Sequence, residues 1–147
     1  MSGVIDTNLL LYAVNLDATE HERARGFLQE AGRSGSHWYL TEGIIYEFLR
    51  VATHPRVFPR PLTAAQAFAF IEALLASPRF GVLSAGPRHW PVLAQLLGEL
   101  RRPAGNLFFD VRTVALMREH GVRRIHTADT DFLQFPGIEV VDPLRAR

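Results

Sequence analysis

Two carboxylates fall where a helix would place an apolar side chain. Glu47 follows Ile44 by three residues and precedes Val51 by four, so helical periodicity turns it toward the apolar face. Asp110 has the same spacing within a second apolar stripe, in the helix expected over residues 107–120. Burying an isolated ionised carboxylate is costly, so each of these groups needs a cation, a proton or a metal ion nearby.

Three further acids follow expected strands. Asp6 stands at the end of the strand expected over residues 3–5, and Asp129 and Asp131 follow the strand expected over residues 122–127. In an open parallel sheet, ligands bind outside the carboxyl ends of the strands, near the point where the strand order reverses. We therefore expect five acids to converge on one pocket as its catalytic residues: Asp6, Glu47, Asp110, Asp129 and Asp131.

Five acids in one pocket indicate a bound cation, because like charges at close range cannot all stay ionised without compensation. The chain has no cysteine and its six histidines show no ligand spacing, so oxygen ligands favour Mg²⁺, with Mn²⁺ as the alternative ion. All 16 Lys+Arg residues are arginine, which excludes a P-loop lysine and a Schiff-base lysine. The pattern indicates metal-dependent hydrolysis of a phosphodiester, a reaction in which such ions commonly activate water.

The segments that must position these acids alternate between short strand patterns and longer helix patterns, which is typical of an α/β fold with a parallel sheet. Strands are expected over residues 3–5, 37–40, 80–83, 122–127 and 138–141. Helices are expected from Leu9, from a cap at Asp17 or Thr19 to Gly32, and over residues 41–53, 63–76 (with a capping box of Thr63 and Gln66), 87–100 and 107–120. The chain has 147 residues, 48% of them hydrophobic, and no repeat or linker, so we expect one domain over residues 1–147.

The net charge and the apolar segments bear on membrane association and on localisation. A net charge of +1 gives no strong global attraction to nucleic acid or to a membrane, although the arginines remain available for local phosphate contacts. The longest apolar-rich run, residues 64–76, contains Gln66 and Glu72 and is too short to cross a bilayer. With no recognisable targeting signal, we expect a soluble cytoplasmic protein that makes no membrane contact.

Four blocks of sequence surround the acids: DTNLLLYA, IIYEFLR, NLFFDVRTVA and TADTDF. In this order and at this spacing they resemble the PIN-domain ribonucleases, and most of all the VapC-type toxins of bacterial VapBC toxin–antitoxin pairs. The resemblance extends over nearly the whole chain. One departure is Val111, which follows Asp110 where many members have alanine, and it should affect packing more than chemistry.

The resemblance implies a PIN-like fold, a parallel sheet of about five strands flanked by helices, and an endoribonuclease that depends on Mg²⁺ or Mn²⁺. It implies that Asp6 and Asp110 hold the metal ion and that Glu47 and Asp129 complete the acidic shell. Asp131 matches a further acid that only some members have. The products would carry 5′-phosphate and 3′-hydroxyl ends. Asn8 and Thr127 occupy motif positions that usually support the acids through hydrogen bonds.

The resemblance also implies three partners: an RNA substrate, a cognate VapB-type antitoxin, and a second copy of the chain in a homodimer. The helix expected over residues 63–76 is apolar almost all round, which in a small domain indicates an interface as well as a core face. The side chains expected at that surface are Phe68, Phe70, Ile71, Leu74 and Leu75.

Plainer structural roles compete with these interpretations. Asp6, Asp129 and Asp131 could be caps and turn residues, and Glu47 and Asp110 could be buried ion-pair partners of Arg50, Arg112 or another arginine. Trp38 and Trp90 are expected to pack in the core or at an interface, and the arginines at positions 56, 60, 101 and 102 either bind RNA phosphates or are solvated.

Two other functions also remain open. An aspartyl-type phosphatase also starts with an acid after its first strand, but it requires a second aspartate two positions later, where this chain has Asn8, and a lysine, which the chain lacks. A non-catalytic binding module on the same fold is the other alternative. The presence of all four family acids argues against it.

Overall fold

A five-stranded parallel sheet forms the centre of the structure, a computed structural model that describes residues 2–145. The strands are β1 (Gly3–Ile5), β2 (Trp38–Thr41), β3 (Phe80–Leu83), β4 (Arg124–His126) and β5 (Glu139–Val141). Their order across the sheet is β3-β2-β1-β4-β5, and every neighbouring pair is parallel. This confirms the predicted α/β class and the predicted number of strands.

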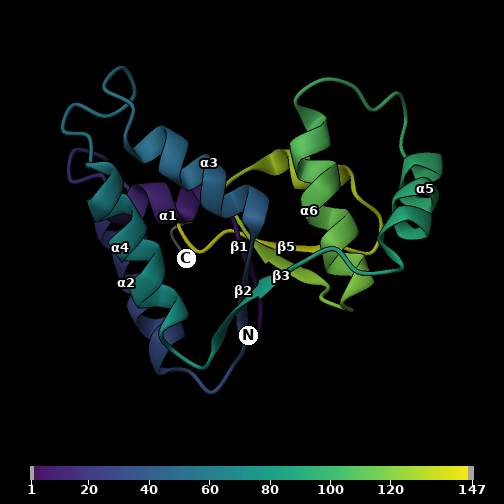
Figure 1. Cartoon of the computed structure of the whole chain (residues 1–147), viewed down its shortest axis with the longest axis horizontal. Helices are drawn as coiled ribbons and strands as arrows, with labels where there is room; N and C mark the ends of the chain where they lie inside the picture. The colour runs from purple at the N-terminus through teal and green to yellow at the C-terminus, as the bar shows by residue number, and fades with distance from the viewer. Residues whose placement is uncertain (1, 146–147) are drawn as a thin grey trace.

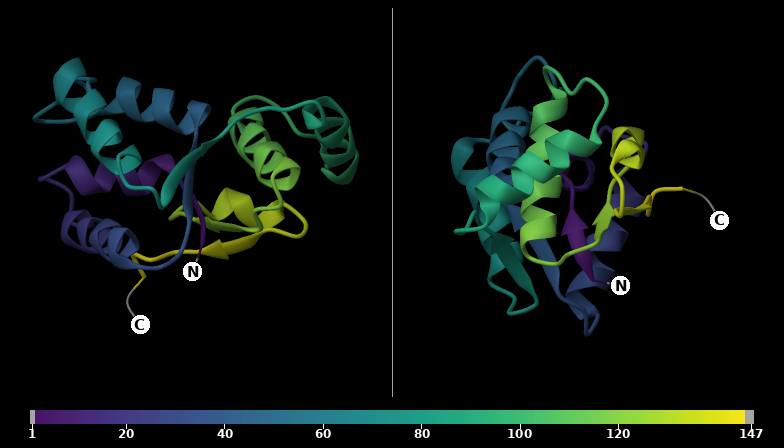
Figure 2. Two further views of the ribbon diagram at one scale, coloured as in Figure 1. Left: turned by 60° about the horizontal axis from the view of Figure 1, so that its bottom comes forward. Right: turned by 90° about the vertical axis from the view of Figure 1, so that its right-hand side faces the viewer.

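Helices cover both faces of this sheet. They are α1 (Thr7–Val14), α2 (His21–Arg33), α3 (Glu42–Ala52), α4 (Ala64–Leu75), α5 (His89–Glu99) and α6 (Leu107–Glu119), with a short 3₁₀ helix η1 (Thr130–Gln134). Helices α1 to α4 gather on one side of the sheet, and α5 and α6 lie on the other (Figures 1 and 2). This split follows from right-handed crossovers, because the chain steps in one direction from β1 to β3 and in the opposite direction to reach β4.

The core lies between the sheet and the inner faces of the helices. All three residues of β1 are buried, as expected for a central strand covered on both faces. Leu9 and Leu10 of α1 and Phe48 of α3 have no exposed surface on one side of the sheet, and Val114 of α6 has none on the other. Fully burying side chains of this size contributes about 1.5–3 kcal/mol each, which holds the helices that carry the acids in fixed positions.

Several element boundaries differ from the expected ones for local reasons. Strand β4 starts two residues later than predicted, because Val122 N–H donates to the carbonyl of Met117 at 2.8 Å beyond Gly121, which has a φ of +70°. This is a Schellman C-cap, in which glycine adopts the left-handed conformation at no steric cost. At α2, neither predicted cap is used, since Glu20 precedes the helix without a side-chain cap. The capping box of Thr63 and Gln66 is confirmed.

Helix α4 is apolar almost all round, and its buried residues are Ala67 and Ile71. Ile71 is buried, so its predicted place on an exposed interface is wrong for the folded monomer, whereas Phe68, one turn earlier, is 55% exposed. Phe70 stacks on Phe48 of α3, with ring centroids 5.2 Å apart. Among residues 2–145 no helix combines the length and apolar character that a membrane crossing requires.

Candidate active site

The direction in which the chain crosses the sheet reverses between β1 and β4. From β1 the chain runs outward through β2 to β3, and it then returns to the other side of β1 to form β4 and β5. Ile5 pairs with His126 in the register of the two central strands, so the next residues, Asp6 and Thr127, are neighbours at their carboxyl ends. This is the place where open α/β sheets bind ligands, and Asp6 stands at it as predicted.

Asp6 is buried, and hydrogen bonds fix its carboxylate. Thr7 N–H donates to Oδ1 at 2.8 Å, while the Thr127 hydroxyl and the Asn8 side-chain amide donate to Oδ2 at 2.7 and 3.2 Å. Asn8 also donates to Thr127 Oγ1 at 3.0 Å and accepts from Ala128 N–H at 3.1 Å. The predicted supporting role of Asn8 and Thr127 is confirmed, because they join the start of α1 to the end of β4 and leave Asp6 a single orientation.

Asp129 and Asp131 lie in the turn that follows β4. Asp129 N–H donates to Thr127 Oγ1 at 2.9 Å, and Asp129 Oδ1 accepts from Asp131 N–H at 2.8 Å as the N-cap of η1. Asp6 is likewise the N-cap of α1. The plainer role as caps is therefore correct for both residues. The cap hydrogen bond uses only Oδ1 of each carboxylate, so both side chains still bring a negative charge to the site.

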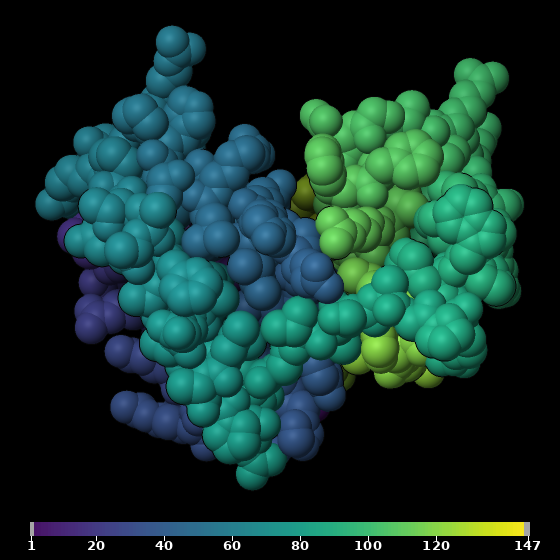
Figure 3. Space-filling view, viewed as in Figure 1, coloured from purple at the N-terminus to yellow at the C-terminus, as the bar shows by residue number. Residues whose placement is uncertain are grey.

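Glu47 on α3 and Asp110 on α6 approach the same edge of the sheet from two helices. Both are half-buried. A cleft between the helices is lined by Asp6, Glu47 and Asp110, and a second hollow that shares Glu47 and Asp110 is lined by Asp129 and Asp131 as well. Figure 3 shows the notch between α3 and α6 at the surface. The structure thus brings all five predicted acids to these two adjoining hollows, which together form the acidic cleft.

The donors in this cleft suit a hard divalent cation. Carboxylate oxygens of Asp110, Asp129 and Asp131 all lie within 4.8 Å of one another. Three hard oxygen donors at this separation match what Mg²⁺ and Mn²⁺ take from proteins. The ligands predicted from sequence are Asp6 and Asp110, so Asp110 belongs to both sets.

The electrostatics of the cleft oppose full ionisation. Burial raises the pKa of Asp6 from its ordinary 3.8 to about 6, against hydrogen bonds from Thr127 and Thr7 that lower it; the charges of Glu47 and Asp129 raise it further. Burial also raises the pKa of Asp110 to about 7, and the charges of the four other acids add to this rise. Acids whose pKa values are raised by burial and by neighbouring like charges are typical of functional sites.

The alternative in which arginines neutralise the helix acids is wrong. Within residues 2–145 no arginine forms an ion pair with Glu47 or Asp110, although Arg50 and Arg112 line the same cleft. His126, which borders the acids in sequence, packs instead against the rings of Phe27 and Trp38 and does not line the cleft.

Two aromatic side chains of the cleft escaped the sequence analysis. Tyr46 and Phe109 line the cleft and are 71% and 67% exposed. Each immediately precedes one of the two helix acids, Glu47 and Asp110, and that shared pattern is the signal that could have found them. Trp90, the expected core or interface residue, is 78% exposed on α5, away from the cleft.

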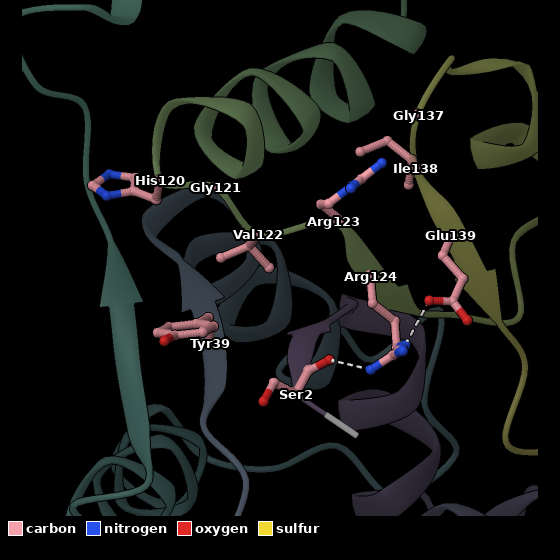
Figure 4. Close-up of a pocket in the computed structure, with 10 residues that line it drawn as sticks. All are labelled: Ser2, Tyr39, His120, Gly121, Val122, Arg123, Arg124, Gly137, Ile138 and Glu139. Carbon is pink, nitrogen blue, oxygen red and sulfur yellow. Dashed lines mark hydrogen bonds and ion pairs between the residues drawn. The ribbon is translucent and has the colours of Figure 1, made fainter.

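A second pocket lies at the amino ends of the strands and differs from the acidic cleft. Its lining includes Ser2, Arg124 and Glu139, the residues next to the starts of β1, β4 and β5. Arg124 Nε donates to Glu139 at 2.9 Å and its Nη1 donates to the Ser2 carbonyl at 3.2 Å (Figure 4). Because these charges are already paired, the pocket offers no comparable ligand set.

Comparison with known proteins agrees with this geometry. Residues 3–138 match the model of the PIN domain. The chain is 39% identical over 140 residues to Ribonuclease VapC33 of Mycobacterium tuberculosis, an alignment that covers 95% of this chain and 96% of the relative.

Solved structures share the fold at low sequence identity. The VapBC2 structure from Rickettsia felis bound to a promoter DNA fragment matches 95% of this chain and 97% of its own chain, with a TM-score of 0.67 and 14% identity. Mycobacterium tuberculosis VapC20, described as a sarcin–ricin loop cleaving toxin, matches 95% of this chain and 99% of its own, with a TM-score of 0.62 and 17% identity. The chain therefore belongs to the PIN domain family, in the group of the VapC ribonucleases.

Proposed function

We propose that this chain is the endoribonuclease toxin of a VapBC-type pair and that it hydrolyses RNA phosphodiester bonds in the cytoplasm with Mg²⁺, or with Mn²⁺ in its place. The observation that carries the proposal is the cleft between α3 and α6, where five carboxylates meet and no arginine of residues 2–145 pairs with the helix acids. The relatives named VapC ribonucleases support RNA as the substrate.

The proposed roles follow from the donors and their bonds. Asp6 and Asp110 would hold the ion, and Glu47 and Asp129 would complete the acidic shell directly or through water. Asp131 joins them through its place in the group of three close carboxylates. When bound in this shell, a divalent ion would supply a nucleophile from water and offset the negative charge of the phosphate. Thr127 and Asn8 hold the Asp6 carboxylate toward the cleft at neutral pH.

The partners belong to the same proposal. A cognate VapB-type antitoxin is supported by the Rickettsia felis neighbour, which is a VapBC assembly. The exposed face of α4 around Phe68 and the half-buried Phe70, Leu74 and Leu75 offer a surface for that antitoxin or for a second copy of the chain. Residues 1–147 would act as one domain, since one sheet and one core cluster draw on elements from both ends of the described chain.

The test is cleavage of total RNA by the purified protein with Mg²⁺ or Mn²⁺, with EDTA and with Asp6→Asn. We expect discrete fragments with 5′-phosphate ends that disappear in EDTA and in Asp6→Asn, while circular dichroism shows both proteins folded. Asp17→Asn is the matched control, because Asp17 is an acid outside the cleft that pairs with Arg60. This control should cleave like the parent.

Two results would overturn the proposal. RNA bound but left intact with every divalent ion would favour a non-catalytic binding module. Turnover of small phosphoesters without RNA cleavage would favour a phosphatase.

A further inference from the structure

Each wall of the acidic cleft combines an aromatic ring with a guanidinium group. Tyr46 and Arg50 lie on α3, and Phe109 and Arg112 lie on α6. The members of each pair are four and three residues apart, so each pair shares one helix face. The acids form the floor between the two walls. This arrangement places an apolar ring and a cation on both sides of the site where a phosphodiester would react.

The two rings are exposed to a degree that is unusual for large apolar side chains. Tyr46 is 71% and Phe109 is 67% exposed, and within residues 2–145 neither ring packs against another aromatic ring. Exposed rings that gather at a cleft mark a binding site more often than chance exposure does. A nucleobase is a suitable occupant, since every base has a π face that stacks on an aromatic side chain.

The two arginines keep their donors free for a ligand. Within residues 2–145 the guanidinium groups of Arg50 and Arg112 have no hydrogen bond or ion pair, although acids line the same cleft. Arg112 lies against Gly43 on the facing helix, where a Cβ atom would stand 3.2 Å from its Nη1. The missing side chain of Gly43 therefore lets the guanidinium group cross to α3 and face the cleft. Planar guanidinium groups bind phosphate oxygens through two parallel hydrogen bonds.

We propose that the cleft binds an unpaired RNA nucleotide, with its base stacked on Tyr46 or Phe109 and its flanking phosphates bound by Arg50 and Arg112. The inference rests on the proposed function, because it places a strand phosphate over the acid floor. A base inside a duplex has both faces covered by its neighbours, so stacking on Tyr46 or Phe109 requires an unpaired nucleotide. An apolar peptide would cover the rings and leave both guanidinium groups without an anion.

The experiment measures binding by Asp110→Asn, which removes a floor acid and keeps both walls. Fluorescence anisotropy compares a labelled oligoadenylate of about 12 nucleotides with an abasic strand of the same length and charge. Loss of the bases should weaken binding about five- to a hundredfold, as measured for stacked bases. Adding Tyr46→Leu and Phe109→Leu should bring that ratio close to one, and Tyr46→Phe should preserve it. Trp90→Leu, an exposed aromatic on α5, is the matched control and should leave the ratio unchanged.

The arginine arm tests the phosphate contacts separately. Arg112→Ala should weaken both strands equally and reduce the slope of log affinity against log salt by about 0.7, the value for one phosphate contact on a single strand. Annealing the complementary strand should abolish the base-dependent part of the binding.

Three outcomes would overturn the inference while metal-dependent cleavage of total RNA still stands. The first is an unchanged ratio of affinities for the normal and abasic strands in the leucine variants, and the second is duplex binding as strong as that of the single strand. The third is a change in the oligomeric state of the leucine variants on sedimentation, which would assign the rings to contact with a second copy. Loss of cleavage in the parent protein would instead overturn the proposed function.

Discussion

Helix α6 has an acid at each end, and the fold treats the two in opposite ways. Glu119 in the last turn is buried, yet its Oε2 accepts from Gly86 N–H at 2.7 Å, its Oε1 lies 3.1 Å from His89 Nδ1, and its backbone carbonyl accepts from Arg88. Asp110 in the first turn is half-buried among four other acids, and no arginine of residues 2–145 pairs with it. One carboxylate is fully partnered, while the other has like charges as neighbours.

This difference indicates a structural role for Glu119 and a functional role for Asp110. Glu119 joins the end of α6 to the loop before α5, so its hydrogen bonds stabilise the fold and leave nothing for a ligand. Asp110 lies near the amino end of its helix, where the helix dipole favours a negative charge but offsets only part of the repulsion. The remaining destabilisation is what a bound cation would relieve. An acid that lies among like charges without a cationic partner is therefore the better indicator of function in this molecule.

The largest expected effect is on catalysis. Asp110→Asn should lower metal-dependent RNA cleavage by more than about a hundredfold, because changes beyond the direct ligands alone typically cost 10- to 100-fold. Glu119→Gln should leave the rate per folded molecule close to that of the parent, since the acidic cleft lies at the other end of the helix. The measurement is the initial rate on the mapped RNA, normalised to the folded fraction. Equal losses in the two variants would contradict the division of roles.

The next effect is on stability, where the change at Glu119 should be larger than the change at Asp110. Glu119→Ala should lower the free energy of unfolding by about 2–4 kcal/mol, because Gly86 N–H and His89 lose their buried partner. Urea titration followed by circular dichroism measures the change. Glu72→Ala, an exposed acid on α4, is the matched control and should stay within about 0.5 kcal/mol of the parent. A loss below that of the control would mean that the Glu119 contacts contribute nothing to the fold.

A smaller effect should appear in the pH dependence of stability. The folded pKa of Asp110 is raised from 3.8 to about 7, so the stability tied to its proton is present below pH 4 and is lost as pH rises to 7. Asp110→Asn removes this loss and should stabilise the protein by about 1–2 kcal/mol at pH 8, a value discounted for solvent access. The gain should shrink toward pH 5. Thermal melts in EDTA measure it, and a variant less stable than the parent at pH 8 would contradict it.

Of the two acids at the ends of α6, the sequence predicts the role of Asp110 and not that of Glu119. Glu47 and Asp110 interrupt helical apolar stripes, and Asp6 and Asp129 follow strands, so local periodicity was enough to bring them to one edge of a parallel sheet. The partners of Glu119 are 30 or more residues away in the chain and show no periodic relation to it. Only tertiary packing reveals that contact.

Two other predictions, the exposure of Ile71 and the start of β4, were wrong for the same physical reason. Ile71 belongs to a helix that is apolar almost all round, so periodicity could not distinguish its core face from its exposed one. The late start of β4, at Arg124 and not at the expected Val122, depends on a Schellman hydrogen bond that propensity does not encode. Strong, regular signals fixed the element types and the acid site. Contacts between distant segments decided boundaries, exposure and the structural acid.

The smallest effects come from two glycines, one at each region, and their signs should differ. Gly86→Ala would place a Cβ 2.8 Å from Glu119 Oε2, an atom that is buried and hydrogen-bonded, so we expect a loss of about 1 kcal/mol from the displaced bond. Gly43→Ala would place a Cβ 3.2 Å from Arg112 Nη1, at the free end of an exposed side chain that can move. Because Gly43 lies within α3, alanine there should leave stability unchanged or raise it by up to about 1 kcal/mol.

Binding should then separate these two glycine variants. Gly43→Ala moves the guanidinium group of Arg112 without changing any charge, so single-stranded RNA should bind more weakly than to the parent, but no more weakly than to Arg112→Ala. Gly86→Ala should bind RNA like the parent once corrected for its folded fraction, because the Glu119 contacts do not reach the cleft. Urea titration and oligoadenylate anisotropy on the same preparations give both quantities. A Gly43→Ala protein with unchanged RNA affinity would show that the missing side chain of Gly43 does not set the position of Arg112 for RNA binding.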